Sequence, residues 1–413
     1  MAINSERLQN TLYKLADFGA LPEGGTSRLT YSKEFMQAQA YLQQEMQAIG
    51  MTTEVDAAGN LIGTLQGTQT QLPPVMSGSH LDTVPHGGNF DGVLGIVTAL
   101  EVARSWHEEG YVPERSLQVI ATAEEEGTAF GMACFGVRVR SGEFKGQSAA
   151  EIKCTGREGT LADCLNEAGL PQDALTSAAL ELDNLAAFVE LHIEQGAELD
   201  ELQLEAGVVT HIVGYDRLHL TFIGEANHAG TTAMHRRKDA AAAGAEVVLA
   251  VRDLARQYKR FVATVGKFIV EPNVPNIVPG KVSLCIETRS YDDAILREVR
   301  EQVLNIIEAA AAANGVTWQT DGDFHVPAVP LSERLVAAAC AEADKLQLKY
   351  RTLPSWAGHD AQIFAGAGVP TVMLFVPSVL GISHAPEEYS TPENIFQGCC
   401  LLDAVLKKLV SEE

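Results

Sequence analysis

Acidic residues and histidines gather in four short clusters, and each cluster follows an apolar run or lies between glycines. The clusters occupy residues 79–82, 89–92, 124–127 and 190–192, and a fifth piece, 383–386, lies far downstream. Placing so many carboxylates at strand ends is unfavourable unless a cation neutralises them, because burial and like charge both oppose ionisation. The pattern therefore predicts a site for a pair of divalent metal ions, and with it the chemistry of a hydrolase.

Strand and helix signals alternate over roughly the first 200 residues. Helices are expected at 33–49 and 92–107, and buried strands at 74–77, 117–123 and 187–189. This order predicts an α/β fold with a largely parallel sheet. Functional sites in such sheets form at the carboxyl ends of the strands, which is where the clusters fall.

The pattern changes near residue 210. The expected order is then strand 218–222, helix 239–257, strands 261–269 and 282–288, helix 292–314 and strand 316–320. This β-α-β-β-α-β order is typical of a ferredoxin-like α+β domain. We therefore expect a discontinuous metal-binding domain, residues 1–209 and 326–413, with a second domain, residues 210–325, inserted into it.

The net charge of this 413-residue chain is −24, which argues against nucleic acid or an anionic membrane as a partner. No apolar stretch approaches the roughly 20 residues of a membrane span, and the first residues do not resemble a signal peptide. The seven cysteines are odd in number and show no CxxC spacing, which favours reduced thiols. We therefore expect a cytoplasmic protein. An anionic substrate would need a local arginine or metal to overcome the overall charge.

Each cluster also has an ordinary explanation when it is taken alone. His80 could lie in a solvated turn, Asp91 could be a helix N-cap, and the run 124–126 could be an exposed charge cluster. His192 could lie at the rim of the core, and His384 could be a loop residue. Together they favour metal binding, because all five pieces follow elements expected at one edge of one sheet. Two ions that share a bridging carboxylate need this set of imidazole and carboxylate ligands.

The chain also resembles a known group over nearly its whole length, from residue 24 onward. The motifs that carry the resemblance are GSHLDT at 78–83, GGNFDG at 87–92, EEEG at 124–127, VELHIEQG at 189–196, NHAGTT at 227–232, NIVPG at 276–280, GHDA at 358–361 and GISH at 381–384. They are similar to those of the allantoate amidohydrolase and N-carbamoyl-L-amino-acid hydrolase group. That group belongs to the di-metal, peptidase-like amidohydrolases.

The resemblance implies a di-zinc catalytic domain and an inserted lid domain that also forms a homodimer. The implied ligands are His80, Asp91 and His192 for one ion, and Asp91, Glu126 and His384 for the other. Glu125 would be the general base, and His228 in the inserted domain would stabilise the oxyanion. Asp82 is placed to orient the ring of His80. Zinc is expected first, although manganese, cobalt and nickel also suit such ligands.

Substrate recognition is expected partly from the inserted domain. The resemblance implies that Arg289 binds the substrate carboxylate in a bidentate contact, and a salt bridge with Glu287 or Asp292 is the alternative. Further contacts to the substrate are expected from Asn276, Gln195, His211 and Gly358. Trp356 stands where the group usually has a small residue, which narrows the expected pocket.

The implied activity is hydrolysis of the carbamoyl (ureido) C–N bond of a small carboxylate. Allantoate is the first expected substrate, and an N-carbamoyl-L-amino acid is the alternative. A dipeptidase or acyl-amino-acid hydrolase on the same scaffold is a more distant reading. A catalytically inactive binding protein is a rival from another class, but Glu125 and the full set of ligands argue against it.

Overall fold

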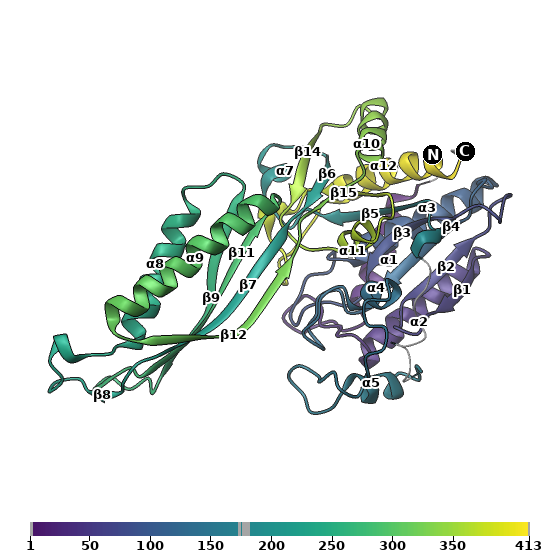
Figure 1. The fold of residues 1–413 in the computed structure, drawn as a ribbon. Helices are drawn as coiled ribbons and strands as arrows, with labels where there is room; N and C mark the ends of the chain where they lie inside the picture. The colour runs from purple at the N-terminus through teal and green to yellow at the C-terminus, as the bar shows by residue number, and fades with distance from the viewer. Residues whose placement is uncertain (1–2, 172–174, 176–181, 412–413) are drawn as a thin grey trace. The chain divides into compact units, whose positions relative to one another are not determined.

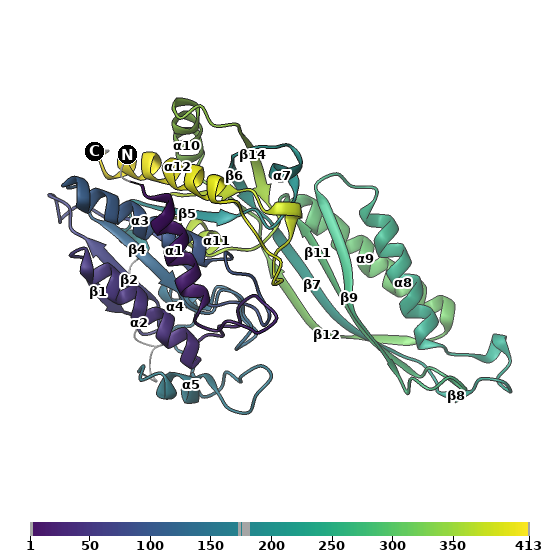
Figure 2. The ribbon, with the colours of Figure 1, turned by 180° about the vertical axis from the view of Figure 1, so that it is seen from behind.

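The chain forms two units, one built on a mixed sheet and the other on a smaller antiparallel sheet (Figure 1, Figure 2). The computed structural model describes residues 3–171, 175 and 182–411. The first unit comprises Met1–Thr210 and Pro330–Glu413, and the second comprises His211–Val329. Each unit has its own apolar core.

The sheet of the first unit has nine strands in the order β1-β2-β4-β3-β5-β15-β6-β13, with β14 paired to β6. The strands are β1 Thr52–Val55, β2 Leu61–Leu65, β3 Val75–His80, β4 Leu117–Thr122, β5 Ala187–Ile193, β6 Ala206–Ile212, β13 Val329–Pro330, β14 Tyr350–Ser355 and β15 Thr371–Val376. The neighbours β4, β3, β5 and β15 run parallel, whereas β1, β2 and β6 pair antiparallel. The predicted α/β fold with a largely parallel sheet is confirmed.

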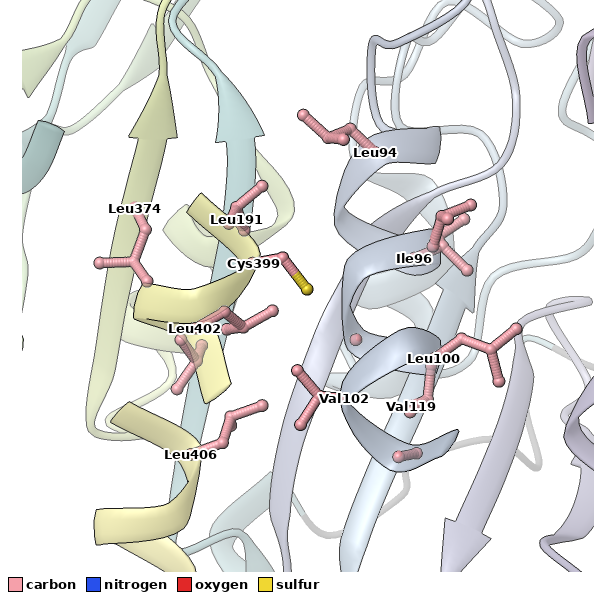
Figure 3. Packing of buried hydrophobic residues seen from close by; sticks show 14 of the residues in the cluster. Leu94, Ile96, Leu100, Val102, Val119, Leu191, Leu374, Cys399, Leu402 and Leu406 are labelled. Atoms are coloured by element: carbon pink, nitrogen blue, oxygen red, sulfur yellow. The ribbon is translucent and has the colours of Figure 1, made fainter. Parts of the chain in front are cut away.

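Helices cover this sheet. They are α1 Ser5–Ala16, α2 Lys33–Ala48, α3 Val93–Glu109, α4 Phe135–Arg140, α5 Leu161–Glu167, α7 Glu198–Glu201, α10 Glu333–Lys345, α11 Asp360–Gly366 and α12 Pro392–Val410, with 3₁₀ turns at Leu182–Asn184 and Val379–Gly381. Leu100 of α3 and Leu402 of α12 are fully buried in the same core as Leu191 of β5 (Figure 3). In the described part of the chain, no helix combines the length and the apolar character that crossing a membrane requires.

Burial on both faces explains the apolar character of the central strands. Every residue of β3, β5 and β15 is buried, as expected for parallel strands covered by helices on both sides. Local signals set the helix ends. The Ser32 hydroxyl accepts a hydrogen bond from the Phe35 amide at the start of α2, and Thr391 does the same for Asn394 at the start of α12.

The second unit has a four-stranded antiparallel sheet in the order β12-β7-β11-β9 and a two-stranded ribbon of β8 and β10. Its elements are β7 Gly214–Ile223, β8 Asn227–His228, a 3₁₀ turn at Met234–Arg236, α8 Ala240–Ala255, β9 Phe261–Glu271, β10 Ile277–Val278, β11 Lys281–Ser290, α9 Asp293–Asn314 and β12 Thr317–Val326. Val282, Leu284 and Ile286 of β11 lie in its core. A role for this unit as a lid or in dimerisation stays a prediction.

Candidate functional site

Three parallel neighbours in the sheet lead into the acidic and histidine clusters. His80 is the last residue of β3, residues 124–126 follow β4, and His192 lies within β5, one residue before its end. Since parallel strands end at the same edge of a sheet, these side chains meet there. Asp91 comes from the loop before α3, and His384 comes from the loop before α12.

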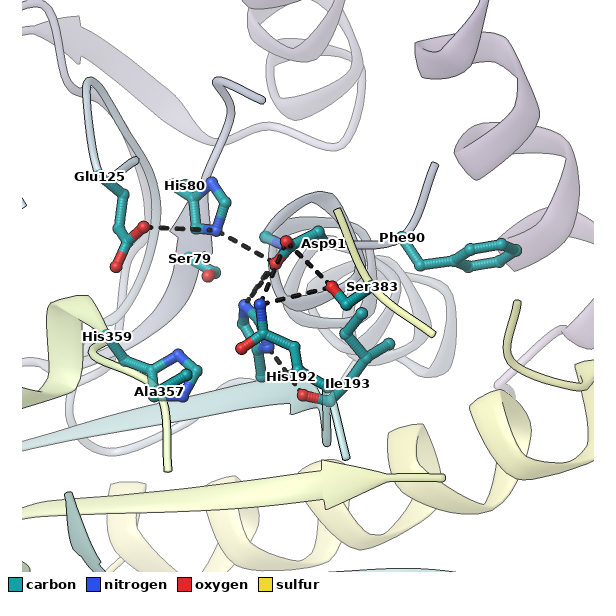
Figure 4. A network of polar contacts seen from close by, with 12 residues as sticks. Ser79, His80, Phe90, Asp91, Glu125, His192, Ile193, Ala357, His359 and Ser383 are labelled. Carbon is teal, nitrogen blue, oxygen red and sulfur yellow. Dashed lines mark hydrogen bonds and ion pairs between the residues drawn. The ribbon is translucent and has the colours of Figure 1, made fainter. Parts of the chain in front are cut away.

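The carboxylate of Asp91 joins two groups of potential metal ligands, and Figure 4 shows it beside His80 and His192 of the first group. Its Oδ1 lies 3.5 Å from Nε2 of His80 and 3.2 Å from Nε2 of His192. Its Oδ2 lies 3.0 Å from Nε2 of His384, which is 3.5 Å from Oε1 of Glu126. Within each group the ligand atoms lie within 4.8 Å of one another. The five residues expected to be ligands therefore lie together, with Asp91 common to both groups.

Asp91 is not the N-cap of α3, although capping that helix was the ordinary explanation for this residue. The N-cap of α3 is Gly92, and no side chain caps this helix. Gly92 has a left-handed φ of 68°, and a Cβ there would lie 2.4 Å from Nδ1 of His80. A glycine is therefore needed to turn the chain from Asp91 into the helix beside the His80 ring. This close approach leaves the Asp91 carboxylate facing the histidines.

Backbone carbonyls fix the orientation of two imidazole rings. Nδ1 of His80 donates to the carbonyl of Asp82 at 2.9 Å, and Nδ1 of His192 donates to the carbonyl of Ile193 at 2.8 Å. With the proton on Nδ1, Nε2 of each ring is left unprotonated near Oδ1 of Asp91, and Nε2 of His192 also accepts the backbone amide of Gly92 at 3.3 Å. Asp82 therefore orients His80 through its carbonyl, and the expected carboxylate contact is not the one observed. The carboxylate instead accepts the backbone amides of Glu125 and Glu126 at 3.1 and 3.2 Å.

Glu125 lies beside the first group. Its Oε2 is 3.9 Å from Nε2 of His80, and its Oε1 accepts a weak bond from the Cys134 thiol at 3.4 Å. Burial raises the pKa of Glu125 well above its usual value, and the nearby Glu126 acts in the same direction, although His80 opposes the shift. A carboxylate with a raised pKa is a stronger base than one in water.

The residues at this site fit a pair of divalent cations. Among the described residues, buried Oδ1 of Asp91 and Oε1 of Glu126 accept no hydrogen bond. Burial and the neighbouring Asp91 raise the pKa of Glu126 to about 7. Partnerless buried oxygens are unfavourable, and a cation would satisfy them. Three imidazoles and two carboxylates are a donor set that suits zinc and other first-row divalent ions.

A third histidine and carboxylate group lies deeper, formed by Glu190, His192 and His359. Both oxygens of Glu190 and Nε2 of His359 already have protein partners. Glu190 accepts the Ser79 hydroxyl at 2.6 Å and the backbone amide of Ala361 at 3.0 Å, and Nε2 of His359 lies 2.8 Å from the Ser355 hydroxyl. The rings of His192 and His359 pack edge to face with centroids 4.6 Å apart. Through these contacts, Glu190 and His359 support the side chain of His192.

Sequence reasoning missed Glu388. This buried carboxylate accepts the backbone amides of Phe90 and Asp91 at 2.9 and 3.0 Å through one oxygen, and the Ser383 hydroxyl at 2.9 Å through the other. A Cβ on Gly88 would lie 2.1 Å from the first oxygen. A glutamate four residues after His384 carries no signal of this role in the sequence, so only the folded loops reveal it.

Two further expected residues lie at this site in the first unit. Nε2 of Gln195 lies 3.2 Å from Oδ2 of Asp91 and 3.3 Å from Nε2 of His384, so its amide contacts the second ligand group. Gly358 lies in the loop between β14 and α11, next to His359. The structure therefore brings Gln195 to the ligands and places Gly358 next to His359, whose ring packs against the ligand His192.

His228 and Asn276 lie together on the ribbon of the second unit. His228 pairs with Ile277 in the ribbon, and the Asn276 carbonyl accepts the backbone amide of Ala229 at 2.9 Å. Nδ1 of His228 accepts the amides of Gly230 and Thr231 at 3.0 and 3.1 Å. A neutral His228 ring must therefore carry its proton on Nε2, where the exposed ring can donate it.

Arg289 of β11 forms the salt bridge that was the alternative to substrate binding. Its Nε donates to Oε1 of Glu287 at 2.8 Å, and Arg217 donates to the other oxygen at 2.9 Å. Burial opposes the ionisation of Glu287, but the two arginines hold its pKa below the usual value. Arg289 also lies over the ring of Tyr215, 5.9 Å from its centroid. His211 packs against the ring of Tyr291.

Two histidine and carboxylate groups lie at the carboxyl ends of the strands of an α/β unit. This arrangement is typical of metal-dependent hydrolases. The chain belongs to Peptidase family M20/M25/M40, which matches residues 76–408. An allantoate amidohydrolase of Escherichia coli (strain K12) is 38% identical over 408 residues, which cover 98% of this chain and 98% of that protein. An N-carbamoyl-L-amino-acid amidohydrolase of Paenarthrobacter aurescens is 37% identical over 411 residues, again 98% of each.

A solved structure agrees with this family assignment. The crystal structure of a hydantoinase/carbamoylase family amidase from Burkholderia multivorans has a TM-score of 0.90 to this chain at 32% identity. The match covers 100% of this chain and 99% of that one. The family resemblance inferred from the motifs is confirmed.

Proposed function

We propose that this protein hydrolyses the carbamoyl C–N bond of a small ureido carboxylate and releases the free amine, ammonia and carbon dioxide. The observation that carries the proposal is the position of Asp91, which is shared by two ligand groups, with Glu125 beside the first of them. Allantoate is the first candidate substrate, and N-carbamoyl-L-amino acids are the second. The activities named for the relatives support both.

Metal binding is the first part of the proposal. His80, Asp91 and His192 would hold one divalent ion, and Asp91, Glu126 and His384 would hold the other. Bound divalent ions supply Lewis-acid polarisation of a carbonyl group and lower the pKa of coordinated water. Zinc is the first candidate, and manganese, cobalt and nickel suit the same ligands.

Glu125 carries the proton transfers. Its carboxylate takes the proton of the attacking water and delivers it to the leaving nitrogen, as a general base and then a general acid. The position of Glu125 supports this role, because its Oε2 lies 3.9 Å from Nε2 of His80, beside the first ligand group. The hydrogen bonds from the amides of Glu125 and Glu126 to Asp82 fix the backbone at this point.

Residues of the second unit, in the same subunit or in a partner, would bind the rest of the substrate. His228 would donate from Nε2 to the developing oxyanion, since its Nδ1 is held by two backbone amides. Arg289 would bind the substrate carboxylate, oriented by its contact with Glu287. Asn276 and Gln195 would contact the ureido group. A homodimer formed through the second unit and a cytoplasmic location remain predictions from the sequence.

A substrate panel tests the proposal. Metal-free protein is loaded separately with zinc, manganese, cobalt or nickel, and ammonia or amine release is measured with allantoate, N-carbamoyl-L-amino acids, dipeptides and N-acyl amino acids. We expect turnover of ureido carboxylates only. Turnover confined to dipeptides or acyl amino acids would replace the proposal with the more distant alternative.

A further inference from the structure

Two cysteines of the first unit lie in contact with each other. The sulfur of Cys154 lies 3.3 Å from the sulfur of Cys164, which is ten positions further along the chain. Both residues are free thiols. Since a disulfide bond is about 2.05 Å long, a movement of about 1 Å would bring the two sulfurs to bonding distance.

The backbone of the loop before α5 holds the two thiols together (Figure 1). Lys153 and Thr160 form an isolated β-bridge, and the amide of Cys154 donates to the carbonyl of Gly159 at 3.0 Å. Thr160 is also the N-cap of α5, and Cys164 lies one turn into that helix. Because the bridge closes the loop beside the helix cap, the contact between the thiols is set by the backbone and not by side-chain rotation alone.

The two thiols differ in exposure. Cys164 is buried, whereas Cys154 is partly exposed. Both line a cavity of about 280 Å³, whose walls also include Ser32 and Lys33. The cavity gives a small molecule room beside the pair, and the more accessible sulfur is that of Cys154. An oxidant that enters should therefore react with Cys154 first.

A positive charge lies against the buried thiol. The guanidinium of Arg157 contacts the sulfur of Cys164 and forms an ion pair of 3.3 Å with Glu167. Burial and the contact with Cys154 raise the pKa of Cys164 to about 11, and Arg157 opposes this shift. A neighbouring cation favours the thiolate, which is the form that attacks another sulfur. The same charge repels a metal cation, so the pair suits disulfide formation better than metal binding.

We propose that Cys154 and Cys164 are a modification site at which a peroxide forms a reversible disulfide bond. The Cys154 sulfur attacks one peroxide oxygen, the O–O bond breaks, and the departing oxygen leaves as water with the thiol proton. This step gives a sulfenic acid at Cys154. The Cys164 sulfur then attacks the sulfur of that sulfenic acid, the S–O bond breaks, and a second water leaves with the Cys164 proton. The two thiols lose two electrons in total, and the peroxide gains them.

A dithiol reductant would reverse the modification. Its thiolate attacks the protein disulfide, and its second thiol releases both cysteines as the reductant becomes a cyclic disulfide. The protein disulfide would fix the loop before α5. The amide of Thr155 in this loop donates to the carbonyl of Ala129 at 2.7 Å, and the amide of Ala129 donates to Glu124 at 2.7 Å. The modified loop is thus hydrogen-bonded to the segment that follows the acidic cluster 124–126.

Tryptic mapping of the full-length protein tests the proposal. Trypsin releases Cys154 in the peptide 154–157 and Cys164 in the peptide 158–217, each with a single cysteine. The folded protein is treated with hydrogen peroxide, its remaining thiols are alkylated, and it is then denatured and digested without reductant. We expect the two peptides to be joined, with a loss of two hydrogen atoms from their summed mass, and to separate after treatment with dithiothreitol.

Three variants identify the two thiols and their order of reaction. Cys154→Ser and Cys164→Ser should each lose the joined peptides. In Cys164→Ser the sulfenic acid at Cys154 should persist and react with a cyclic 1,3-diketone. Cys340→Ser, at a partly exposed cysteine of α10, is the matched control and should keep the joined peptides.

The wild-type result does not depend on the folding of any variant. Recovery of Cys154 and Cys164 in separate peptides after peroxide treatment, as thiols or as sulfinic and sulfonic acids, would overturn the proposal. Pairing of Cys154 with a different cysteine in equal yield would also overturn it. The outcome is independent of turnover, so it separates this inference from the proposed function.

Discussion

The carboxylate of Glu388 accepts a hydrogen bond of 3.0 Å from the backbone amide of Asp91, the residue shared by both ligand groups. Its other oxygen accepts the hydroxyl of Ser383, the neighbour of His384, at 2.9 Å. One buried carboxylate thus joins the loop that carries Asp91 to the loop that carries His384. These loops lie far apart in the chain, so the spacing of the second ligand group depends on Glu388.

Replacement of Glu388 should loosen the second ligand group. Glu388→Ala leaves three donors without their acceptor, and we expect metal affinity at the group of Asp91, Glu126 and His384 to fall about 10- to 100-fold. Metal content after dialysis and calorimetric titration measure this effect. Glu342→Ala, at a buried glutamate of α10 that pairs with Lys345, is the matched control. Wild-type affinity for both ions in Glu388→Ala would contradict the role.

Gly88 should tolerate no side chain, because a Cβ would lie 2.1 Å from Oε1 of Glu388. We expect Gly88→Ala to lower the free energy of unfolding by about 1–3 kcal/mol, as Glu388 or its loop shifts to relieve the overlap. Urea denaturation measures the change. Gly366→Ala is the control, since no atom lies within 4 Å of the added Cβ. Equal stability of the two variants would show that the loops adjust freely.

Loss of the proposed base should separate chemistry from metal binding. Glu125→Gln keeps the shape of the side chain but cannot accept the proton, so kcat should fall about 10²- to 10⁴-fold while metal content stays the same. Glu124→Gln is the neighbouring control, because an amide oxygen can still accept the Ala129 and Phe130 amides that Glu124 binds. Near-normal turnover in Glu125→Gln would remove Glu125 from the mechanism.

Arg289 should act mainly in substrate binding. With Arg289→Ala we expect KM for ureido carboxylates to rise about tenfold or more, because a charge-assisted contact to the carboxylate is lost. Arg217→Ala provides the control, since Arg217 binds the same Glu287 but has no proposed contact with substrate. An unchanged KM in Arg289→Ala would leave its salt bridge to Glu287 as its only role.

The ligand residues were predictable from the sequence, because strand ends in a parallel sheet share one edge and His80 and His192 lie on adjacent strands. The partners of those residues were not. His80 is oriented by a backbone carbonyl of Asp82, which no side-chain pattern specifies. Glu388 acts only through loops that meet after folding. For Arg289 the sequence left two readings open, and Glu287 is its neighbour in the structure because residues two apart share a strand face.

Titration of metal-free protein with divalent ions tests whether the two ligand groups that share Asp91 bind two ions. Ammonia release from a ureido carboxylate is followed as zinc or manganese is added in measured equivalents. The proposed site predicts negligible activity without metal and a rise to a plateau at two equivalents per chain, with Asp91→Asn inactive throughout. Full activity in metal-free protein, or in Asp91→Asn, would contradict a two-metal site centred on Asp91.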